Sequence, residues 1–217
     1  MKTVAILSQK GGSGKTTTAL HMAVAAYQAD QSVVVIDLDP QGSAAAWFEA
    51  RKRAGHTADP IVMPTHPAQL EAMLDNLRGQ GADWVFIDTA PQSDNLAVKA
   101  AEWSDLVVIT CKPSVMDLRA IQSTLRLTQI AGVTPHVLLT QTEAQGTRHT
   151  EAAETLATLN VQVIPFQTTK RVAYMDSLID GQTATEFEPT GRAAEESRQI
   201  FGHIEKLAQT SQKVRAA

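Results

Sequence analysis

A run of glycine, lysine and threonine near the start of the chain is the segment best equipped for chemistry. It reads Lys10, Gly11, Gly12, Ser13, Gly14, Lys15, Thr16 and Thr17. Three glycines in four positions let the backbone curl tightly, so that successive amide N–H groups point inward and form a nest for an anion. A lysine and a hydroxyl follow directly, as the binding of phosphate and Mg²⁺ requires. The segment therefore predicts a loop that holds the phosphates of a nucleotide.

The polar side chains of this loop have distinct expected tasks. Lys15 would reach the β- and γ-phosphates, and the hydroxyl of Thr16 would bind Mg²⁺. Thr17 would contact the α-phosphate. Because a short apolar run precedes the loop and a helical pattern follows it, the helix N-terminus would add its partial positive charge to the same site.

Aspartates follow two further apolar runs. Asp37 and Asp39 follow the run at residues 33–36, and their alternation places both on one side of an extended segment. Two carboxylates held together are costly without a cation or water nearby, and a magnesium–nucleotide site supplies both. Asp88 ends the run at residues 84–87, a pattern typical of an aspartate that holds Mg²⁺ through water. The alternative is that an aspartate here only caps a turn or a helix.

Short apolar runs alternate with longer helical patterns along the chain. The runs lie at residues 3–7, 33–36, 84–87, 106–109, 137–139 and 161–164. Helix-like spacing marks residues 15–29, 117–131 and 147–159. This alternation predicts an α/β fold with a mainly parallel, twisted sheet and helices on both faces. Ligands of such sheets bind beyond the carboxyl ends of the strands, where these motifs stand.

Composition limits the classes of protein that the chain can form. With 217 residues, 43% of them hydrophobic, residues 1–217 are expected to form a single domain. Only residues 209–217 lack a pattern that predicts order, so they are expected to form a disordered tail. The net charge of -4 excludes a strongly basic nucleic-acid binder, and any contact with DNA would need a local patch.

Two further features bear on location. The single cysteine, Cys111, excludes an intramolecular disulfide and fits a reducing cytosol. No signal-peptide pattern begins the chain, and no stretch approaches the roughly 20 apolar residues of a membrane span. We therefore expect a cytoplasmic protein.

The last helical pattern, at residues 191–209, carries apolar side chains at Ile200, Ile204 and Leu207. This spacing predicts a helix that packs on the rest of the domain. A membrane anchor would need a fuller apolar face backed by lysine and arginine, so no stable membrane association is expected.

The phosphate loop, with Lys10 ahead of its glycines, resembles the deviant Walker A motif of the ParA/MinD family of P-loop ATPases. This family contains the partition ATPases, the septum-site ATPase of the Min system and the nitrogenase iron protein. The run Asp-Leu-Asp-Pro-Gln-Gly from Asp37 and the run Asp-Thr-Ala-Pro from Asp88 are similar to the two switch segments of the family. The resemblance covers most of the chain, and it implies a P-loop NTPase fold that hydrolyses ATP with Mg²⁺.

The resemblance also implies roles for individual residues. Lys10 would cross a dimer interface to the phosphates of the partner's nucleotide, and Asp39 would orient and help to activate the attacking water. Asp37 would support the water shell of Mg²⁺, and Asp88 would hold the ion. Family members contact the base after two later strands, which here gives Gln141, Pro165 and Phe166 as candidates.

A similar Pro-x-x-x-Asp element, at Pro113 and Asp117, packs near the dimer interface in the family. A simple helix cap explains these residues equally well.

The closest likeness is to the small plasmid-partition ParA ATPases. It implies an ATP-dependent homodimer that binds DNA without sequence preference and is nucleoid-associated when ATP is bound. A ParB-type centromere-binding or adaptor protein would stimulate its hydrolysis. The candidate DNA contacts are Lys170, Arg171, Arg192 and Arg198. Residues 165–217 hold seven basic and seven acidic residues, so an exposed helix with ordinary ion pairs, such as Arg192 with Glu196 or Glu195 with Arg198, is the alternative.

Other uses of the same scaffold stay open. A ParA-like ATPase could position a protein cargo instead of DNA, and a MinD-like regulator would cycle on a membrane. An iron–sulfur reductase needs cysteine ligands from each subunit, which the lone Cys111 makes a poor match. An ATP-dependent synthetase would need a substrate pocket for which the sequence has no motif.

Overall fold

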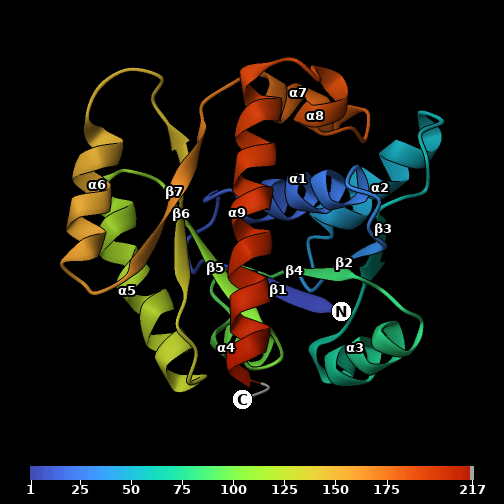
Figure 1. The fold of residues 1–217 in the computed structure, drawn as a ribbon, viewed down its shortest axis with the longest axis horizontal. Coiled ribbons are helices and arrows are strands. Elements are labelled where there is room, and N and C mark those ends of the chain that lie inside the picture. The colour runs from blue at the N-terminus through green and yellow to red at the C-terminus, as the bar shows by residue number, and fades with distance from the viewer. Residues whose placement is uncertain (216–217) are drawn as a thin grey trace.

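The computed structural model describes residues 1–215, and it is built on one sheet of seven strands (Figure 1). The strands run in the order β3-β2-β4-β1-β5-β6-β7, and every neighbouring pair is parallel. Their bounds are β1 (Lys2–Leu7), β2 (Val33–Asp37), β3 (Ile61–Pro64), β4 (Trp84–Asp88), β5 (Leu106–Cys111), β6 (His136–Thr142) and β7 (Gln162–Thr169). The predicted α/β class and parallel sheet are therefore confirmed.

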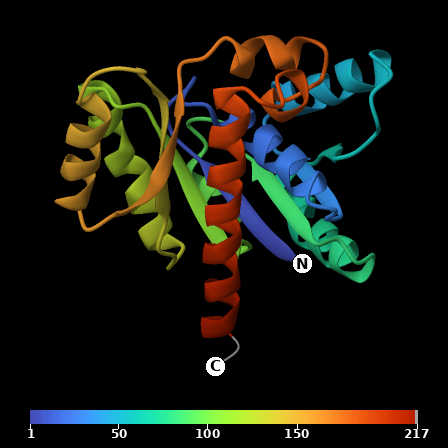
Figure 2. The ribbon, with the colours of Figure 1, turned by 45° about the horizontal axis from the view of Figure 1, so that its top comes forward.

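Helices cover both faces of the sheet (Figures 1 and 2). Their bounds are α1 (Lys15–Tyr27), α2 (Ser43–Arg53), α3 (Leu70–Gly79), α4 (Asp94–Glu102), α5 (Val115–Ile130), α6 (Arg148–Ala157), α7 (Ala173–Ile179), α8 (Ala184–Phe187) and α9 (Arg192–Arg215). A short 3-10 turn, Pro67–Gln69, precedes α3. Helices α1 and α9 lie on one face, and helices α3, α4, α5 and α6 on the other.

The alternation of side chains along β1 explains this two-sided burial. Val4 and Ile6 join the core beneath α1 and α9, whereas Ala5 and Leu7 join the core on the opposite face. Successive side chains of a strand point to opposite faces, so a strand buried on both sides is apolar throughout. This explains why the central strands were visible in the sequence as short, continuous apolar runs.

The two edge strands depart from the sequence prediction. Strand β3, Ile61–Pro64, was missed because it is short, ends in proline and leaves Ile61 exposed. Strand β7 was expected at residues 161–164 but continues to Thr169. Proline is tolerated in an edge strand because only one side of that strand needs hydrogen bonds, and Pro165 therefore lies within β7.

Helix α9 lies lengthwise over the sheet beside α1 (Figure 2). Ile200 and Ile204 are completely buried and Leu207 packs against the same core, which confirms the predicted packing helix. The helix continues past Gln209 to Arg215, so the expected tail at residues 209–217 begins inside it, and residues 216–217 lie outside the described part of the chain. Over the described residues no helix combines the length and apolar character that crossing a membrane requires.

Buried polar contacts hold α7 and α8 against α2. The guanidinium of Arg51 makes two hydrogen bonds to the carboxylate of Glu186, at 2.6 and 3.1 Å, and donates to the carbonyl of Gly181 at 2.7 Å. The indole of Trp47 donates to the carbonyl of Gln182 at 3.0 Å. Because Arg51 is 1% exposed, these contacts fix the position of α7 and α8 relative to the helix that follows β2.

Candidate active site

The phosphate loop connects β1 to α1 at the carboxyl edge of the sheet. Gly12 and Gly14 adopt φ values of 70° and 94°, the left-handed region that a residue with a side chain rarely enters. This backbone shape is what the glycine spacing predicted. It turns the chain from the strand into the N-terminus of α1, where unpaired amide N–H groups face an incoming anion.

Three neighbouring side chains hold the loop from the adjacent strands. Ser13 shares a hydrogen bond of 2.9 Å with the hydroxyl of Thr110, and Thr140 donates to the carbonyl of Ser13 at 2.7 Å. Gln141 donates from Nε2 to the carbonyl of Gly12 at 3.2 Å. The loop is therefore anchored to β5 and β6, and the candidate Gln141 lies directly beside it.

Lys15, Thr16 and Asp88 meet where α1 begins. Lys15 is 7% exposed, and burial lowers the pKa of its ammonium while Asp88 and Asp39 act in the opposite direction. The hydroxyl of Thr16 donates to Oδ2 of Asp88 at 2.7 Å. Asp88 is fully buried, and burial raises its pKa to about 7. The sequence prediction that these residues share one site agrees with this geometry.

The same carboxylate provides a test of whether a magnesium ion fits. Oδ1 of Asp88 is buried and has no hydrogen-bond partner among the described residues. No three His, Cys, Asp or Glu side chains converge in the described part of the chain. An ion here would therefore be held by Thr16, by Asp88 and by nucleotide oxygens and water, the sparse protein ligation that Mg²⁺ prefers. The residues present fit that ion.

The two carboxylates after β2 have different surroundings. Asp37 is buried, and its two oxygens accept hydrogen bonds of 3.0 Å from the backbone N–H groups of Asp39 and Ala45. Burial raises its pKa, against those hydrogen bonds. Asp39 is half-buried, and its Oδ1 accepts from the N–H of Gln41 at 2.9 Å. Asp37 thus ties the loop to the start of α2, while Asp39 stays nearer to solvent.

Lys10 forms an ion pair within its own chain. Its Nζ lies 2.7 Å from Oδ2 of Asp117, which is almost fully buried. Ser114 caps α5 by accepting from the N–H of Asp117 at 3.2 Å, and its hydroxyl donates to the same carboxylate. Ser114 is therefore the capping residue, and the carboxylate of Asp117 binds both the hydroxyl of Ser114 and the ammonium of Lys10.

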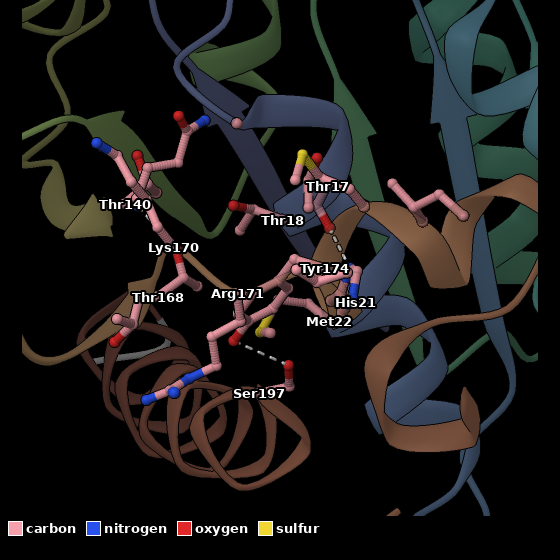
Figure 3. Close-up of a pocket in the computed structure, with 16 residues that line it drawn as sticks. Thr17, Thr18, His21, Met22, Thr140, Thr168, Lys170, Arg171, Tyr174 and Ser197 are labelled. Atoms are coloured by element: carbon pink, nitrogen blue, oxygen red, sulfur yellow. Dashed lines mark hydrogen bonds between the residues drawn. The ribbon is translucent and has the colours of Figure 1, made fainter. Parts of the chain in front are cut away.

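A cavity of about 450 Å³ opens beside the phosphate loop, along α1 (Figure 3). Its walls come from α1, from the ends of β6 and β7, and from α7 and α9. The residues that line it are Gly14, Thr17, Thr18, His21, Met22, Thr140, Gln141, Thr168, Thr169, Lys170, Arg171, Val172, Tyr174, Met175, Leu178 and Ser197. This cavity has apolar walls, adjoins the phosphate loop and is large enough for the base and ribose of a nucleotide.

Two of the predicted base contacts do not line this cavity. Pro165 is exposed, and Phe166 packs against the ring of His203 at a centroid distance of 5.9 Å. The reason is the extra length of β7, which places the turn toward α7 after Thr169 rather than after residue 164. Thr168 and Thr169, which the sequence did not single out, take the expected place at the cavity.

His21 is a further residue that sequence reasoning missed. Its Nε2 accepts from the N–H of Ala184 at 3.1 Å, so Nδ1 carries the proton and donates to the carbonyl of Thr17 at 2.8 Å (Figure 3). Burial lowers its pKa to about 4. A histidine in an apolar helix four residues after Thr17 was the only available signal. The neutral ring connects α1 to the start of α8.

The four candidate DNA contacts do not gather into an unpaired basic patch. Lys170 pairs with Glu143 at 2.5 Å, and Arg171 pairs with Glu196 at 2.7 Å. Arg198 donates to the carbonyl of Pro189 at 2.8 Å. The suggested helical pair of Arg192 with Glu196 is replaced by the pair of Glu196 with Arg171, and Glu195 accepts from Gln199 instead of pairing with Arg198.

A glycine-rich loop on the central strand of a parallel sheet, with a buried lysine and aspartate beside it, defines a P-loop nucleotide-binding protein. A family model described as the CobQ/CobB/MinD/ParA nucleotide binding domain matches residues 4–210. The chain therefore belongs to this family, which confirms the resemblance seen in its motifs, and it is an ATPase of the ParA/MinD type.

Several named relatives resemble the chain over most of its length. It is 36% identical over 166 residues to "Maintenance of carboxysome distribution protein A" of Gloeobacter kilaueensis, covering 76% of this chain and 73% of that protein. The protein of the same name in Halothiobacillus neapolitanus is 25% identical over 209 residues, covering 93% and 95%. The "Chromosome-partitioning ATPase Soj" of Thermus thermophilus is 28% identical over 166 residues, covering 64% and 67%.

Solved structures support the fold. The septum site-determining protein MinD of Pyrococcus horikoshii, complexed with Mg-ADP, superimposes with a TM-score of 0.77 at 17% identity. The match covers 97% of this chain and 98% of that one. The predicted P-loop fold is thereby confirmed.

Proposed function

We propose that the chain is an ATP-driven positioning protein that distributes a protein cargo over DNA. The observation that carries the proposal is its similarity to two carboxysome distribution proteins, one of them 36% identical, together with the contact of Thr16 with Asp88 beside the phosphate loop. The reaction is ATP plus water to ADP plus phosphate. The sequence favoured DNA segregation and kept the positioning of a protein cargo as the alternative. The named relatives support the positioning of a protein cargo.

The residues of the site divide the chemistry among them. Backbone amides of residues 10–14 and the ammonium of Lys15 would bind the phosphates, and Thr16 with Asp88 would hold a magnesium ion, whose charge would stabilise the negative phosphate oxygens. Asp39, half-buried at the mouth of the site, orients the attacking water. Asp37 holds the backbone of Asp39 in place through the hydrogen bond at 3.0 Å. Catalysis then depends on positioning and charge stabilisation.

Dimerisation completes the site. In the proposed ATP-bound sandwich dimer, Lys10 leaves Asp117 and reaches the phosphates bound by the partner subunit. The ion pair at 2.7 Å holds Lys10 while the chain is alone. Once Lys10 has moved away, the hydroxyl of Ser114 would still donate to the carboxylate of Asp117. This arrangement is consistent with an ATPase that turns over slowly until it is paired.

DNA binding without sequence preference follows dimerisation in this proposal, so the protein would be cytoplasmic and nucleoid-associated in its ATP state. Phosphate contacts from lysine and arginine supply such affinity. The candidates are still Lys170, Arg171, Arg192 and Arg198. Lys170 and Arg171 would have to leave their ion pairs with Glu143 and Glu196 to bind DNA phosphates.

Segregation of plasmid or chromosomal DNA is the second candidate function. It is favoured by the similarity to a chromosome-partitioning ATPase. Both functions use the same ATP cycle and the same DNA binding, and they differ in the partner that stimulates hydrolysis. A centromere-binding protein would indicate segregation, and an adaptor that recognises a protein assembly would indicate positioning.

The first experiment replaces Asp39 by alanine and compares it with Asp75→Ala, an exposed aspartate on α3. Phosphate release from ATP measures turnover. Size-exclusion chromatography with light scattering and binding to non-specific duplex DNA are measured with ATP, with ADP and without nucleotide, at two salt concentrations. Asp39→Ala should accumulate an ATP-bound dimer that binds DNA in a salt-sensitive way, while Asp75→Ala behaves as the unaltered protein. Normal turnover by Asp39→Ala would remove that residue from the reaction. Failure to bind DNA in every state would overturn the positioning function and leave the ATPase chemistry intact.

A further inference from the structure

One lysine beside the phosphate loop has no task in the site described above. Lys112 follows the last residue of β5, and a side chain placed on Gly12 would meet its Nζ at 3.9 Å. The ammonium of Lys112 therefore lies beside the middle of the loop whose backbone amides face the nucleotide phosphates. No sequence pattern announces this contact, because the two residues stand far apart along the chain.

The backbone of Lys112 is held at this place by its neighbours. Strand β5 lies directly beside β1 in the sheet, and Thr110 shares a hydrogen bond of 2.9 Å with Ser13 of the phosphate loop. The carbonyl of Lys112 accepts from the N–H of Ser114 at 2.8 Å, and the ring of Pro113 between them fixes its φ. Only the side chain of Lys112 is therefore free to turn beside the loop.

The lysines around the phosphate loop differ in how their charges are balanced. Nζ of Lys10 lies 2.7 Å from Oδ2 of Asp117. The charge of Lys15 is stabilised by the nearby carboxylate of Asp88. Lys112 is half-buried, and within residues 1–215 it belongs to no ion pair. No carboxylate among these residues therefore balances the charge of Lys112 at ion-pair distance.

An unbalanced ammonium at this position raises the free energy of the empty site. The amide N–H groups of the loop and the N-terminus of α1 carry partial positive charge, and Lys15 adds a full charge where the helix begins. A further cation is repelled by these groups until an anion enters. A phosphate group would remove the repulsion and would supply a hydrogen-bond acceptor for the ammonium. Anion binding is therefore more favourable with Lys112 in place.

We propose that Lys112 binds a phosphate oxygen of the nucleotide held by its own chain. The amides of a phosphate loop enclose the α- and β-phosphates, and Gly12 stands in the middle of this loop. Lys112 would therefore contact one of these two phosphates, which ATP and ADP share. It would strengthen the binding of both nucleotides, and it would act before a partner subunit arrives.

This role complements the role proposed for Lys10. Asp117 is 5% exposed, so the departure of Lys10 would leave a buried carboxylate with less compensation for its charge. While the chain is alone, Lys10 stays with Asp117, and Lys15 and Lys112 would meet the phosphates. Lys10 would be added to the site of the partner subunit only in the ATP-bound dimer.

A contact across the dimer interface is the competing assignment, since Lys10 is already expected to reach the partner's nucleotide. The position of Lys112 favours a contact within the chain, because its ammonium lies beside Gly12 of the same chain without any partner subunit. The two assignments also differ in their consequences. A contact within the chain affects nucleotide binding by single chains, whereas a contact across the interface affects only the dimer.

The test measures the affinity of the full chain for ATP with Mg²⁺, for ADP with Mg²⁺ and for inorganic triphosphate by isothermal titration. Light scattering identifies the conditions in which the protein is a single chain, and affinities are compared there. Lys112→Gln removes the charge and keeps a polar side chain. It should weaken all three ligands about tenfold, because one charge-assisted hydrogen bond is lost.

Two matched variants and a change of salt separate the charge of Lys112 from its packing. Lys99→Gln removes the same charge from an exposed lysine on α4 and should leave the three affinities unchanged. Lys112→Arg keeps the charge and should restore most of the affinity. Added salt should weaken ADP binding more in the unaltered protein than in Lys112→Gln, because screening acts on a charge that the variant lacks.

Three results would overturn the assignment. The first is an unchanged affinity of Lys112→Gln for ADP in single chains. The second is an equal loss in Lys112→Gln and Lys112→Arg, which would indicate packing instead of charge. The third is a loss confined to the ATP-bound dimer, which would assign Lys112 to the partner's nucleotide.

The assignment rests on the proposed function in one respect, because it takes the loop to bind nucleotide phosphates. Lys15→Ala in the same titrations tests that assumption separately. Undiminished ATP binding by Lys15→Ala would remove the phosphate site, and with it both the proposed function and the role of Lys112. Loss of ATP binding in Lys15→Ala with none in Lys112→Gln would overturn the role of Lys112 alone.

Discussion

The two halves of the nucleotide site are built in different ways. The phosphate half, from Lys10 to Asp88, takes its polar groups from the ends of three adjacent strands, β1, β2 and β4. The cavity half takes its walls from α1, from the ends of β6 and β7, and from α7 and α9 (Figure 3). The first half is formed by contiguous motifs, and the second by segments that meet only when the chain has folded.

The difference follows from what each half recognises. Phosphate is bound by backbone amides and by a few charges, so a short run of glycines with a lysine is enough. A base is enclosed largely by apolar contact, which many side chains can supply from many positions. Substitutions should therefore act sharply and locally in the phosphate half, and through the packing of helices in the cavity half.

The largest expected effect is the loss of ATP binding in Lys15→Ala. Hydrogen bonds to charged groups contribute about 1.5–3 kcal/mol each, so losing the contacts of this ammonium should weaken ATP on the order of 100-fold or more. Isothermal titration with ATP and Mg²⁺ measures the affinity. Because burial lowers the pKa of Lys15, its charge is costly in the free protein, and thermal unfolding without ligand should not shift downward. Tight ATP binding by the variant would contradict the assignment of the phosphate half.

The structure brings together the residues that the sequence assigned to the phosphate half. Gly12 and Gly14 have the left-handed φ that their spacing implied, and Thr16 contacts Asp88 across 72 positions of the chain. Such contacts are predictable because parallel strands bring their carboxyl ends to one edge of the sheet. The ion pair of Lys10 with Asp117 was not predicted, since the resemblance assigned Lys10 to the partner subunit.

Of the residues that line the cavity, Gln141 was predicted as a base contact from its strand end, and Gly14 and Thr17 were predicted as part of the phosphate loop. His21, Tyr174 and Ser197 read in the sequence as ordinary residues of packed helices, and their meeting depends on how α7 and α9 fold back over α1. Phe166 lies outside the cavity because β7 continues to Thr169, and the boundary of an edge strand containing proline is weakly marked in a sequence. No local sequence pattern predicts which distant residues meet at this cavity.

The second prediction tests whether the cavity half depends on remote packing. Gly181→Ala should destabilise the protein by about 3 kcal/mol, because the added carbon would lie 2.1 Å from the backbone of Arg51 and must push α7 away from α2. Gly132→Ala is the matched control, since Gly132 has a similar φ of 68° but open space around it. Urea unfolding measures the difference between the two. Equal effects would mean that only the backbone conformation matters and that α7 is free to move.

The third prediction concerns the buried ring of His21. Its pKa is about 4 in the folded chain and near 6.5 when unfolded, so the unfolded state binds more protons between these values. The stability that the neutral ring contributes is therefore complete above pH 6.5 and is lost as pH falls toward 4. His21→Gln keeps an acceptor for the N–H of Ala184 but cannot titrate. Between pH 7.5 and pH 5, the unaltered protein should lose about 2 kcal/mol more stability than the variant.

Urea unfolding of both proteins at the two pH values provides the comparison. Other titrating groups, such as Asp88 with its raised pKa, are common to both proteins and cancel in the difference. Parallel pH profiles would show that His21 is not held neutral between α1 and α8. The cavity wall would then be less tightly joined to the phosphate half than the contacts at 2.8 and 3.1 Å imply.

The smallest expected effect is at Gln141, where the two halves meet. Its side chain donates to the carbonyl of Gly12 at 3.2 Å, and its backbone has a φ of 52° that asparagine also tolerates. Gln141→Asn therefore shortens the side chain without a new backbone penalty, and the loss of one hydrogen bond of about 1 kcal/mol should weaken ATP about fivefold. Titration with ATP and with inorganic triphosphate separates the two halves. An equal loss for both ligands would place Gln141 in the phosphate half, because triphosphate carries no base, and a loss for ATP alone would make it a contact of the cavity half.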